Sequence, residues 1–172
     1  MMMQMLEAGG QPVLVDDTRK ADASNLLGYY EYAPVKNLPT DSSWVSTAEG
    51  KAVKVVSPLL RYLPDTFHYR IIFMERDVTE LLASQNVLLA MKGGEAATPR
   101  DRQKWEDRIH RHLGEVLHWL AAHPFIPHIR VRYRQVLVAP RPCAERISRF
   151  LERPMDTRMM AAAIQPTLCN HR

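Results

Sequence analysis

The feature that most constrains this chain is an apolar segment of strand length that leads directly into a helix start. Residues 69–74 read YRIIFM, which is rich in the β-branched and aromatic side chains typical of strands. Asp77 follows, and Glu80 stands three positions later, which is the spacing of a helix capping box. The segment therefore predicts a strand, a short turn and a helix, the repeating unit of an α/β fold.

A basic residue and a hydroxyl flank this predicted helix start. Arg76 stands in the turn, at the carboxyl end of the strand, where ligands bind in open α/β sheets. Ser84 follows Asp77 by two helical turns and shares its helix face. A guanidinium, a hydroxyl and a helix amino terminus can together hold a phosphate. The alternative is structural: Arg76 pairs with a nearby acid, and Ser84 bonds back to its own helix.

The spacing of Arg76 and Ser84 after a strand resembles the 3′-phosphate-binding segment of sulfotransferases that use 3′-phosphoadenosine 5′-phosphosulfate (PAPS). Four other segments resemble bacterial members of this family in the same order: MMMQMLEAGGQPVLVDD, GYYEYAPVK, GKAVKVVSPLLRYLP and RVRYRQVLVAP. The resemblance covers nearly the whole chain and implies one domain over residues 1–172. It implies an α/β fold, a three-layer, P-loop-NTPase-like parallel sheet with helices on both faces.

The resemblance also implies a first strand and loop that the sequence does not contain. In the family, the first strand runs into a Ser/Thr/Gly-rich loop that holds the 5′-phosphosulfate at the head of the first helix. Here MMMQMLEAGG resembles that helix itself, so we expect the chain to be truncated before or at this loop. Gly50-Lys51 is no substitute, because Ala52 replaces the Ser or Thr of a P-loop and a strand is expected next.

Two further residues are given roles by the resemblance. Tyr133, expected to end a strand over residues 129–133, aligns with a family tyrosine that contacts the adenine; a half-buried edge tyrosine is the alternative. Glu31 lies in a region that faces the acceptor, and it is our candidate for the base that sulfuryl transfer needs. A surface glutamate is the alternative for Glu31. Classical members use a histidine near the position of Ser57. Ser57 itself could hold a phosphosulfate or acceptor oxygen, and the alternative is that it ends its strand.

The remaining pattern alternates helices with strands, as a parallel sheet requires. Helices are expected over residues 1–7, 29–38, 78–91, 98–123 and 142–151. Strands are expected over residues 12–15, 52–56, 69–74 and 129–133. Arg130 and Arg132 alternate along the last strand and indicate a solvent-facing edge.

Composition limits the partners of the protein. No apolar run approaches the roughly 18 residues of a membrane span, and the amino terminus does not read as a secretory signal. The formal net charge of +4 suits an anionic nucleotide. The sequence lacks the interleaved aromatic and basic residues that would indicate a nucleic-acid partner. Cys143 and Cys169 lack metal spacing, and His110 and His112 point about 200° apart on a helix. We therefore expect a cytoplasmic protein without a metal, with these histidines on a solvated helix face.

The resemblance implies a sulfotransferase-like protein that moves a sulfuryl group from PAPS to a hydroxyl or amine of a small-molecule or glycan acceptor. The alternative is a non-catalytic remnant, a ligand-binding or interaction protein that has lost the phosphosulfate loop. A kinase-like phosphotransferase is disfavoured, because kinases have no need for a 3′-phosphate clamp formed by Arg76 and Ser84.

Overall fold

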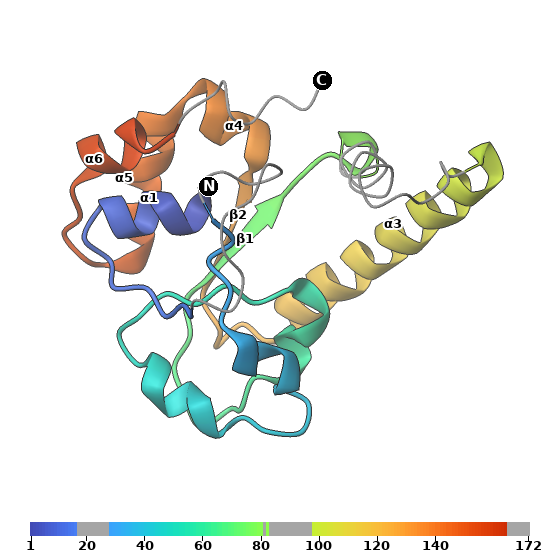
Figure 1. Cartoon of the computed structure of the whole chain (residues 1–172), viewed down its shortest axis with the longest axis horizontal. Coiled ribbons are helices and arrows are strands. Elements are labelled where there is room, and N and C mark those ends of the chain that lie inside the picture. Colours follow the sequence, from blue (N-terminus) through green and yellow to red (C-terminus); the bar gives the residue numbers. More distant parts are fainter. Residues whose placement is uncertain (17–27, 81, 83–97, 165–172) are drawn as a thin grey trace.

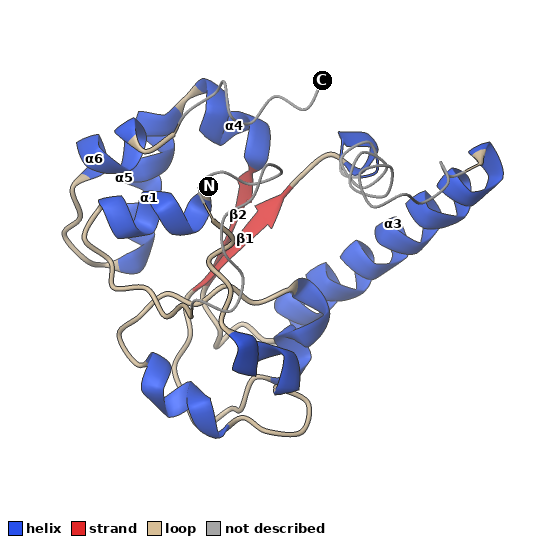
Figure 2. Ribbon diagram, in the orientation of Figure 1, coloured by secondary structure: helices blue, strands red, loops and turns tan. Residues whose placement is uncertain are grey.

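The two strands of the structure run parallel, side by side, with helices packed around them (Figure 2). The computed structural model describes residues 1–16, 28–80, 82 and 98–164. Within these residues the sheet consists of β1 (Ile71–Glu75) and β2 (His128–Arg132), and the register pairs Ile71 with His128 and Glu75 with Arg132. The predicted α/β class is confirmed at this level, as a small parallel sheet with helices.

The helices include the ones expected at the start, middle and end of the chain. The α-helices are α1 (Met2–Ala8), α3 (Pro99–Ala122), α4 (Tyr133–Val138), α5 (Pro140–Leu151) and α6 (Thr157–Ala162). The 3-10 helices are η1 (Ala33–Asn37), η2 (Ser43–Ala48) and η3 (Ser57–Tyr62). Figure 1 shows α1, α4, α5 and α6 gathered together, with α3 as a long separate rod. The described part of the chain contains no helix long and apolar enough to cross a membrane.

Strand β1 is covered on both faces, which explains its unbroken apolar sequence. Ile72 and Met74 pack against a core built from α1, α4, α5 and α6, whose most buried members include Met5, Val136 and Ile147. The alternate residues of the strand point the other way. Ile71 and Phe73 pack with Leu60 of η3 and with Val116 and Leu120 of α3. This two-sided burial is the outcome expected of a strand in a parallel sheet.

Strand β2 is apolar on one side only. Ile129 and Val131 join the core beneath α1 and α5, whereas Arg130 and Arg132 are exposed. The predicted solvent-facing edge is thus confirmed. The guanidinium of Arg130 forms an ion pair with Glu75 of β1, which ties the polar side of the two strands together.

The long helix begins and ends where the sequence indicates. The Thr98 hydroxyl accepts a hydrogen bond from the Asp101 amide, and Pro99 occupies the first turn. Thr98 is therefore a side-chain N-cap, and proline is favoured at the first helical position because no helical hydrogen bond needs its N–H there. The helix ends at Ala122, directly before His123-Pro124. In the second half of the helix, the apolar side chains of Val116 and Leu120 are buried.

Two predicted strands are much shorter than expected. Residues 12–15 and 52–56 meet only at one parallel bridge between Val13 and Ala52, held by Leu14 N to Ala52 O and Ala52 N to Pro12 O, both at 2.8 Å. Gly50, with φ +70°, turns the chain just before the bridge. Pro58 then fixes the first turn of η3, so Ser57 starts a 3-10 helix where a strand end was expected.

Other expected boundaries also change, and two helices were not predicted. The helix over residues 29–38 is reduced to η1, because Tyr30 adopts φ +52°, which no helix accommodates. Residues 129–133 do not all form strand: β2 ends at Arg132, and Tyr133 opens α4, which was not predicted. Helix α5 starts at Pro140, two residues before its predicted start, and α6 was not predicted.

Candidate functional site at the carboxyl end of β1

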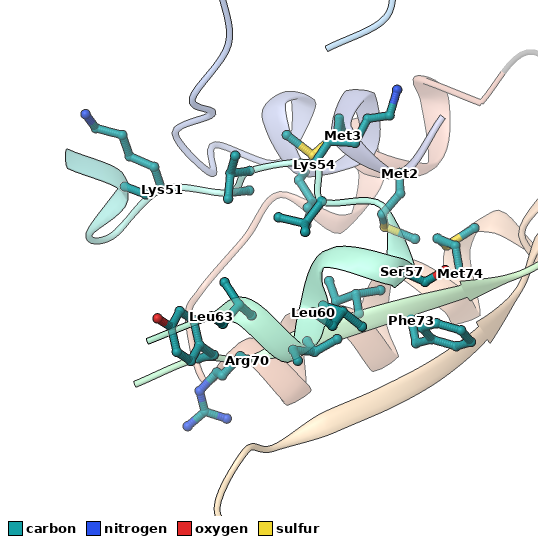
Figure 3. A pocket seen from close by; sticks show the side chains of 18 of the residues that line it. Met2, Met3, Lys51, Lys54, Ser57, Leu60, Leu63, Arg70, Phe73 and Met74 are labelled. Atoms are coloured by element: carbon teal, nitrogen blue, oxygen red, sulfur yellow. The ribbon is translucent and has the colours of Figure 1, made fainter. Parts of the chain in front are cut away.

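A broad cavity of about 1370 Å³ lies along β1, between α1, η3 and α3. Its inner wall is apolar and includes Leu60, Leu63, Phe73 and Met74. Figure 3 shows Lys51, Lys54 and Arg70 at the margin, with their charged ends turned away from these apolar side chains. Lys54 pairs with Glu31 and Arg70 with Glu152. The cavity therefore combines an apolar interior with a charged border, which suits a ligand that has an organic body and polar groups.

The strand–turn–helix predicted around Asp77 is present. The Asp77 carboxylate accepts hydrogen bonds from the Thr79 amide at 2.9 Å and from the Glu80 amide at 3.3 Å. This carboxylate is therefore the N-cap of the helix start, as the sequence predicts. Arg76, one residue earlier, is left at the carboxyl end of β1. Ser84, the predicted second phosphate ligand, lies outside the described residues.

Arg76 and Tyr133, predicted separately, lie against one another. The guanidinium carbon of Arg76 is 4.7 Å from the centre of the Tyr133 ring, within the range of a cation–π contact. Both residues line the cavity. Although Tyr133 opens α4 and does not end a strand, it still stands directly after β2. The parallel pairing of the strands brings the two side chains to the same end of the sheet.

The Arg76 side chain keeps an unused donor. Its Nε atom is buried and has no hydrogen-bond acceptor in the described part of the chain. The nearest carboxylate oxygen is Glu80 Oε2 at 3.9 Å, too far for a hydrogen bond, and the other oxygen of Glu80 is engaged by Arg134. The structural alternative for Arg76 was a pair with a nearby acid, and the long ion pair with Glu80 agrees with it in part. A buried N–H without an acceptor costs about 1–3 kcal/mol, which a bound anion would recover.

Glu31 lies beside a cavity residue. Its Oε1 atom is 3.6 Å from Lys54 Nζ, and Lys54 also donates a 3.0 Å hydrogen bond to the Tyr29 carbonyl. Lys54 lines the cavity, whereas Glu31 does not belong to the described lining. The contact shown is therefore an ion pair that positions a cavity lysine. The role of Glu31 as a base stays a prediction.

One pair of side chains was missed by the sequence analysis. Ser57 Oγ and His112 Nε2 lie 2.8 Å apart, and both residues line the cavity. The expectation of a solvated face holds for His110, which is exposed, but not for half-buried His112. A signal was present, because His112 falls between Ile109 and Val116 at helical spacing, next to the apolar stripe of α3. Nothing in the sequence connects it with Ser57.

The described residues hold no group of three or more His, Cys, Asp or Glu side chains that could bind a metal ion. Comparisons of the chain with protein-family models, curated proteins and solved structures find no match. The functional argument therefore depends on the geometry of this site and on the sequence resemblance.

Proposed function

We propose that this chain is a sulfotransferase-like protein that binds PAPS at the carboxyl end of β1. The observation that carries the proposal is the buried Nε of Arg76, which lies beside the Tyr133 ring and has no hydrogen-bond acceptor among the described residues. Arg76 would hold the 3′-phosphate, because a guanidinium binds phosphate oxygens with charge-assisted hydrogen bonds. Ser84 is the proposed second ligand of this phosphate. Tyr133 would contact the adenine with its ring.

The fold proposal extends the observed sheet. We propose that β1 and β2 are neighbouring strands of a three-layer, P-loop-like parallel sheet. The burial of β1 on both faces supports this, since strands inside such sheets are covered by helices on either side. Free, buried Cys143 agrees with the cytoplasmic location that we propose.

A second function, binding without transfer, is favoured by a specific observation. Gly50-Lys51 lies in a turn that leads to the Ala52 bridge, and not at a helix amino terminus. The described residues therefore give the 5′-phosphosulfate no glycine-rich loop of the kind that cradles phosphates. On this alternative, the protein is a ligand-binding or interaction protein that recognises the nucleotide and leaves its sulfuryl group in place.

Calorimetry with adenosine 3′,5′-bisphosphate tests the nucleotide site. We expect the wild-type chain to bind this compound more tightly than adenosine 5′-monophosphate, because only the bisphosphate reaches Arg76. Arg76→Ala should weaken bisphosphate binding by about 1.5–3 kcal/mol, the range for a hydrogen bond to a charged group. Arg141→Ala is the matched control, since Arg141 is an exposed arginine that pairs within α5.

Two results decide between the candidates. Equal affinity of wild type and Arg76→Ala for the bisphosphate would overturn the assignment of the phosphate site. Where binding is present, incubation with sulfur-labelled PAPS and a phenol acceptor separates the two functions. Labelled acceptor identifies a sulfotransferase, and bound but unreacted PAPS identifies a binding protein.

A further inference from the structure

Two backbone segments line the cavity along its length. One is β1, and the other is residues 51–55, which begin beside the Ala52 bridge and lead to Val56, whose backbone is extended. Figure 3 shows Lys51 and Lys54 above, and Arg70 and Met74 below, with both segments running from left to right. The two segments therefore run in the same direction past the same cavity.

The cavity side of β1 has no partner strand among the described residues. Strand β1 pairs with β2 alone, and the Ile71 amide donates to the Pro127 carbonyl. The N–H and C=O groups of successive strand residues point to opposite sides. Those of Ile72 and Met74 therefore point away from β2, and both residues line the cavity.

Residues 51–55 repeat this pattern from the other side. Ala52 uses its N–H and C=O groups in the bridge, with Pro12 and Leu14 as partners. The N–H and C=O groups of Val53 consequently point away from that bridge. Within the part of the chain that the structure describes, neither Val53 nor Val55 makes a backbone hydrogen bond. Each side of the cavity thus presents backbone donors and acceptors that lack a partner.

The chemistry of these two edges identifies what fits between them. Each edge alternates N–H donors with C=O acceptors at the spacing of a strand. A peptide in the extended conformation matches such a row residue by residue, which is how strands add to exposed sheet edges. A compact organic ligand cannot meet both rows at once. An extended peptide segment is therefore the occupant that the backbone groups favour.

The side chains above and below the gap indicate the sequence of that segment. On one face of β1, the cavity is lined by Met3 and Leu6 of α1, and on the other by Leu60 of η3 and Leu113 of α3. Strand β1 is covered in the same way and is apolar on both faces. A segment beside it would also be covered on both faces, so its side chains should form an unbroken apolar run.

Charge at the amino end of the gap indicates its direction. Lys51 is exposed and forms no ion pair with any described residue. The strand pairs in the described residues are all parallel. In a segment parallel to β1, an acidic residue placed directly before the apolar run would lie beside Lys51. A segment running the other way would bring its following residue there instead.

We propose that this cavity accepts an extended segment of a partner protein, which pairs with β1 on one side and with residues 51–55 on the other. The segment runs parallel to β1. It contains about five consecutive apolar residues, the length of β1, and an acidic residue precedes them. The proposal does not depend on the proposed function, because the segment would end where β1 ends, before Arg76.

A synthetic peptide tests the proposal on the full chain. The probe has two glutamates, then Val-Ile-Val-Ile-Val and a soluble tail. Nuclear magnetic resonance on the isotope-labelled protein should show one-to-one binding. The amides of Val53, Ile72 and Met74 should exchange about tenfold more slowly in the complex, because each gains a hydrogen bond. Those of Phe73 and Glu75 should not change, since they already face β2.

A modified peptide separates strand pairing from simple apolar binding. N-methyl groups on the second and fourth apolar residues keep every side chain but remove two amide donors. We expect this peptide to bind at least about tenfold more weakly, the effect of one lost hydrogen bond. Equal affinity of the two peptides would show that the cavity takes apolar side chains without strand pairing, and it would overturn the proposal.

A charge reversal tests the direction of the segment. Lys51→Glu should weaken binding of the probe about threefold, as expected for an exposed ion pair, and should favour a peptide that begins with two lysines. Lys36→Glu is the matched control, because Lys36 is exposed and lies outside the cavity lining. Equal affinity of Lys51→Glu and Lys36→Glu for the probe, or tighter binding of a peptide with its glutamates after the apolar run, would overturn the parallel direction.

Two further outcomes would overturn the proposal itself. One is the absence of peptide binding by the wild-type chain. The other is protection of the Ile72 and Met74 amides in the free chain that increases with protein concentration, which would identify a second copy as the occupant. Arg76→Ala should bind the probe as wild type does, so failure of the nucleotide site and failure of the peptide site can be told apart.

Discussion

The guanidinium of Arg76 lies over the ring of Tyr133, with 4.7 Å between the guanidinium carbon and the ring centre. The register of the sheet explains why these residues meet. Glu75 and Arg132 are the last paired residues of β1 and β2, and Arg76 and Tyr133 are the next residue of each chain segment. In a parallel sheet, the residues that follow two neighbouring strands emerge at the same edge. The contact is therefore a direct consequence of strand pairing.

Substitution of Tyr133 tests the adenine contact. Tyr133→Ala should weaken the binding of adenosine 3′,5′-bisphosphate by about 1–3 kcal/mol, the range for stacking of one base on an aromatic ring. Tyr133→Phe keeps the ring and should bind nearly as well as wild type. Tyr62→Ala is the control, because Tyr62 is an exposed tyrosine outside the cavity lining. Titration calorimetry that finds equal affinity for Tyr133→Ala and wild type would remove Tyr133 from the site.

The sequence predicted those parts of the fold that depend on interactions between residues close together in the chain. The Asp77 cap, the Thr98-Pro99 start of α3 and the apolar run of β1 each depend on residues within one or two helical turns. The bridge that replaces two expected strands depends on tertiary context. Residues 12–15 and 52–56 have strand-forming side chains, but Gly50 and Pro58 limit how far the chain stays extended.

The candidate site was predictable only where it follows strand ends. Arg76 was singled out because it stands after an apolar run, and Tyr133 because of the family resemblance; the pairing of β1 with β2 brings them together. Ser57 and His112 meet through the packing of η3 on α3, which no local spacing records. A pair of this kind can be found only from the tertiary structure, because a serine or a histidine considered alone usually has a purely structural role.

Substitution of two glycines by alanine should change the free energy of unfolding in opposite directions, because Gly9 lies against α6 and Gly114 faces open space. A methyl group on Gly9 would lie 2.5 Å from Cγ of buried Met160, whereas one on Gly114 would meet nothing within 4 Å. Gly9→Ala should therefore lower the free energy of unfolding by about 1–3 kcal/mol, the cost of overpacking a core. Gly114→Ala, within helix α3, should raise it by up to about 1 kcal/mol. Urea unfolding of both variants measures the difference, and similar values for the two would contradict the packing of α1 on α6.

We expect the folded protein to lose stability at high pH, because two of its tyrosines have raised pKa values. Burial, the hydrogen bond to Glu7 and the charge of Glu7 raise the pKa of Tyr30 to about 12, and burial beside Asp65 raises the pKa of Tyr69 to about 12. The unfolded chain loses these protons near pH 10, before the folded chain does. The stabilisation is therefore complete below pH 10 and is lost as the pH rises to about 12.

Melting temperatures measured across that pH range test this expectation. The wild-type melting temperature should fall, and Tyr30→Phe should fall less because it has no phenol to ionise. Tyr62→Phe, at an exposed position, is the control and should follow wild type. An equal fall in Tyr30→Phe and wild type would show that the contact between Tyr30 and Glu7 does not govern the pH response.

The final prediction concerns the edge of β1 that does not pair with β2. The Ile71 amide donates to the Pro127 carbonyl at 2.9 Å. Because successive residues of a strand direct their amides to opposite sides, those of Phe73 and Glu75 also face β2, whereas those of Ile72 and Met74 face the cavity. Among the described residues, these two amides make no hydrogen bond in a turn, loop or cap.

Hydrogen exchange followed residue by residue by nuclear magnetic resonance tests this alternation. The amides of Ile72 and Met74 should exchange about tenfold faster than those of Phe73 and Glu75, because a tenfold ratio corresponds to about 1.4 kcal/mol, close to the net contribution of one hydrogen bond. Ile129 and Val131 of β2 serve as internal references, since both pack against the same core as Ile72 and Met74. Equal protection of all four β1 amides would show that the cavity side of the strand is paired in solution, and that a further strand lies against β1.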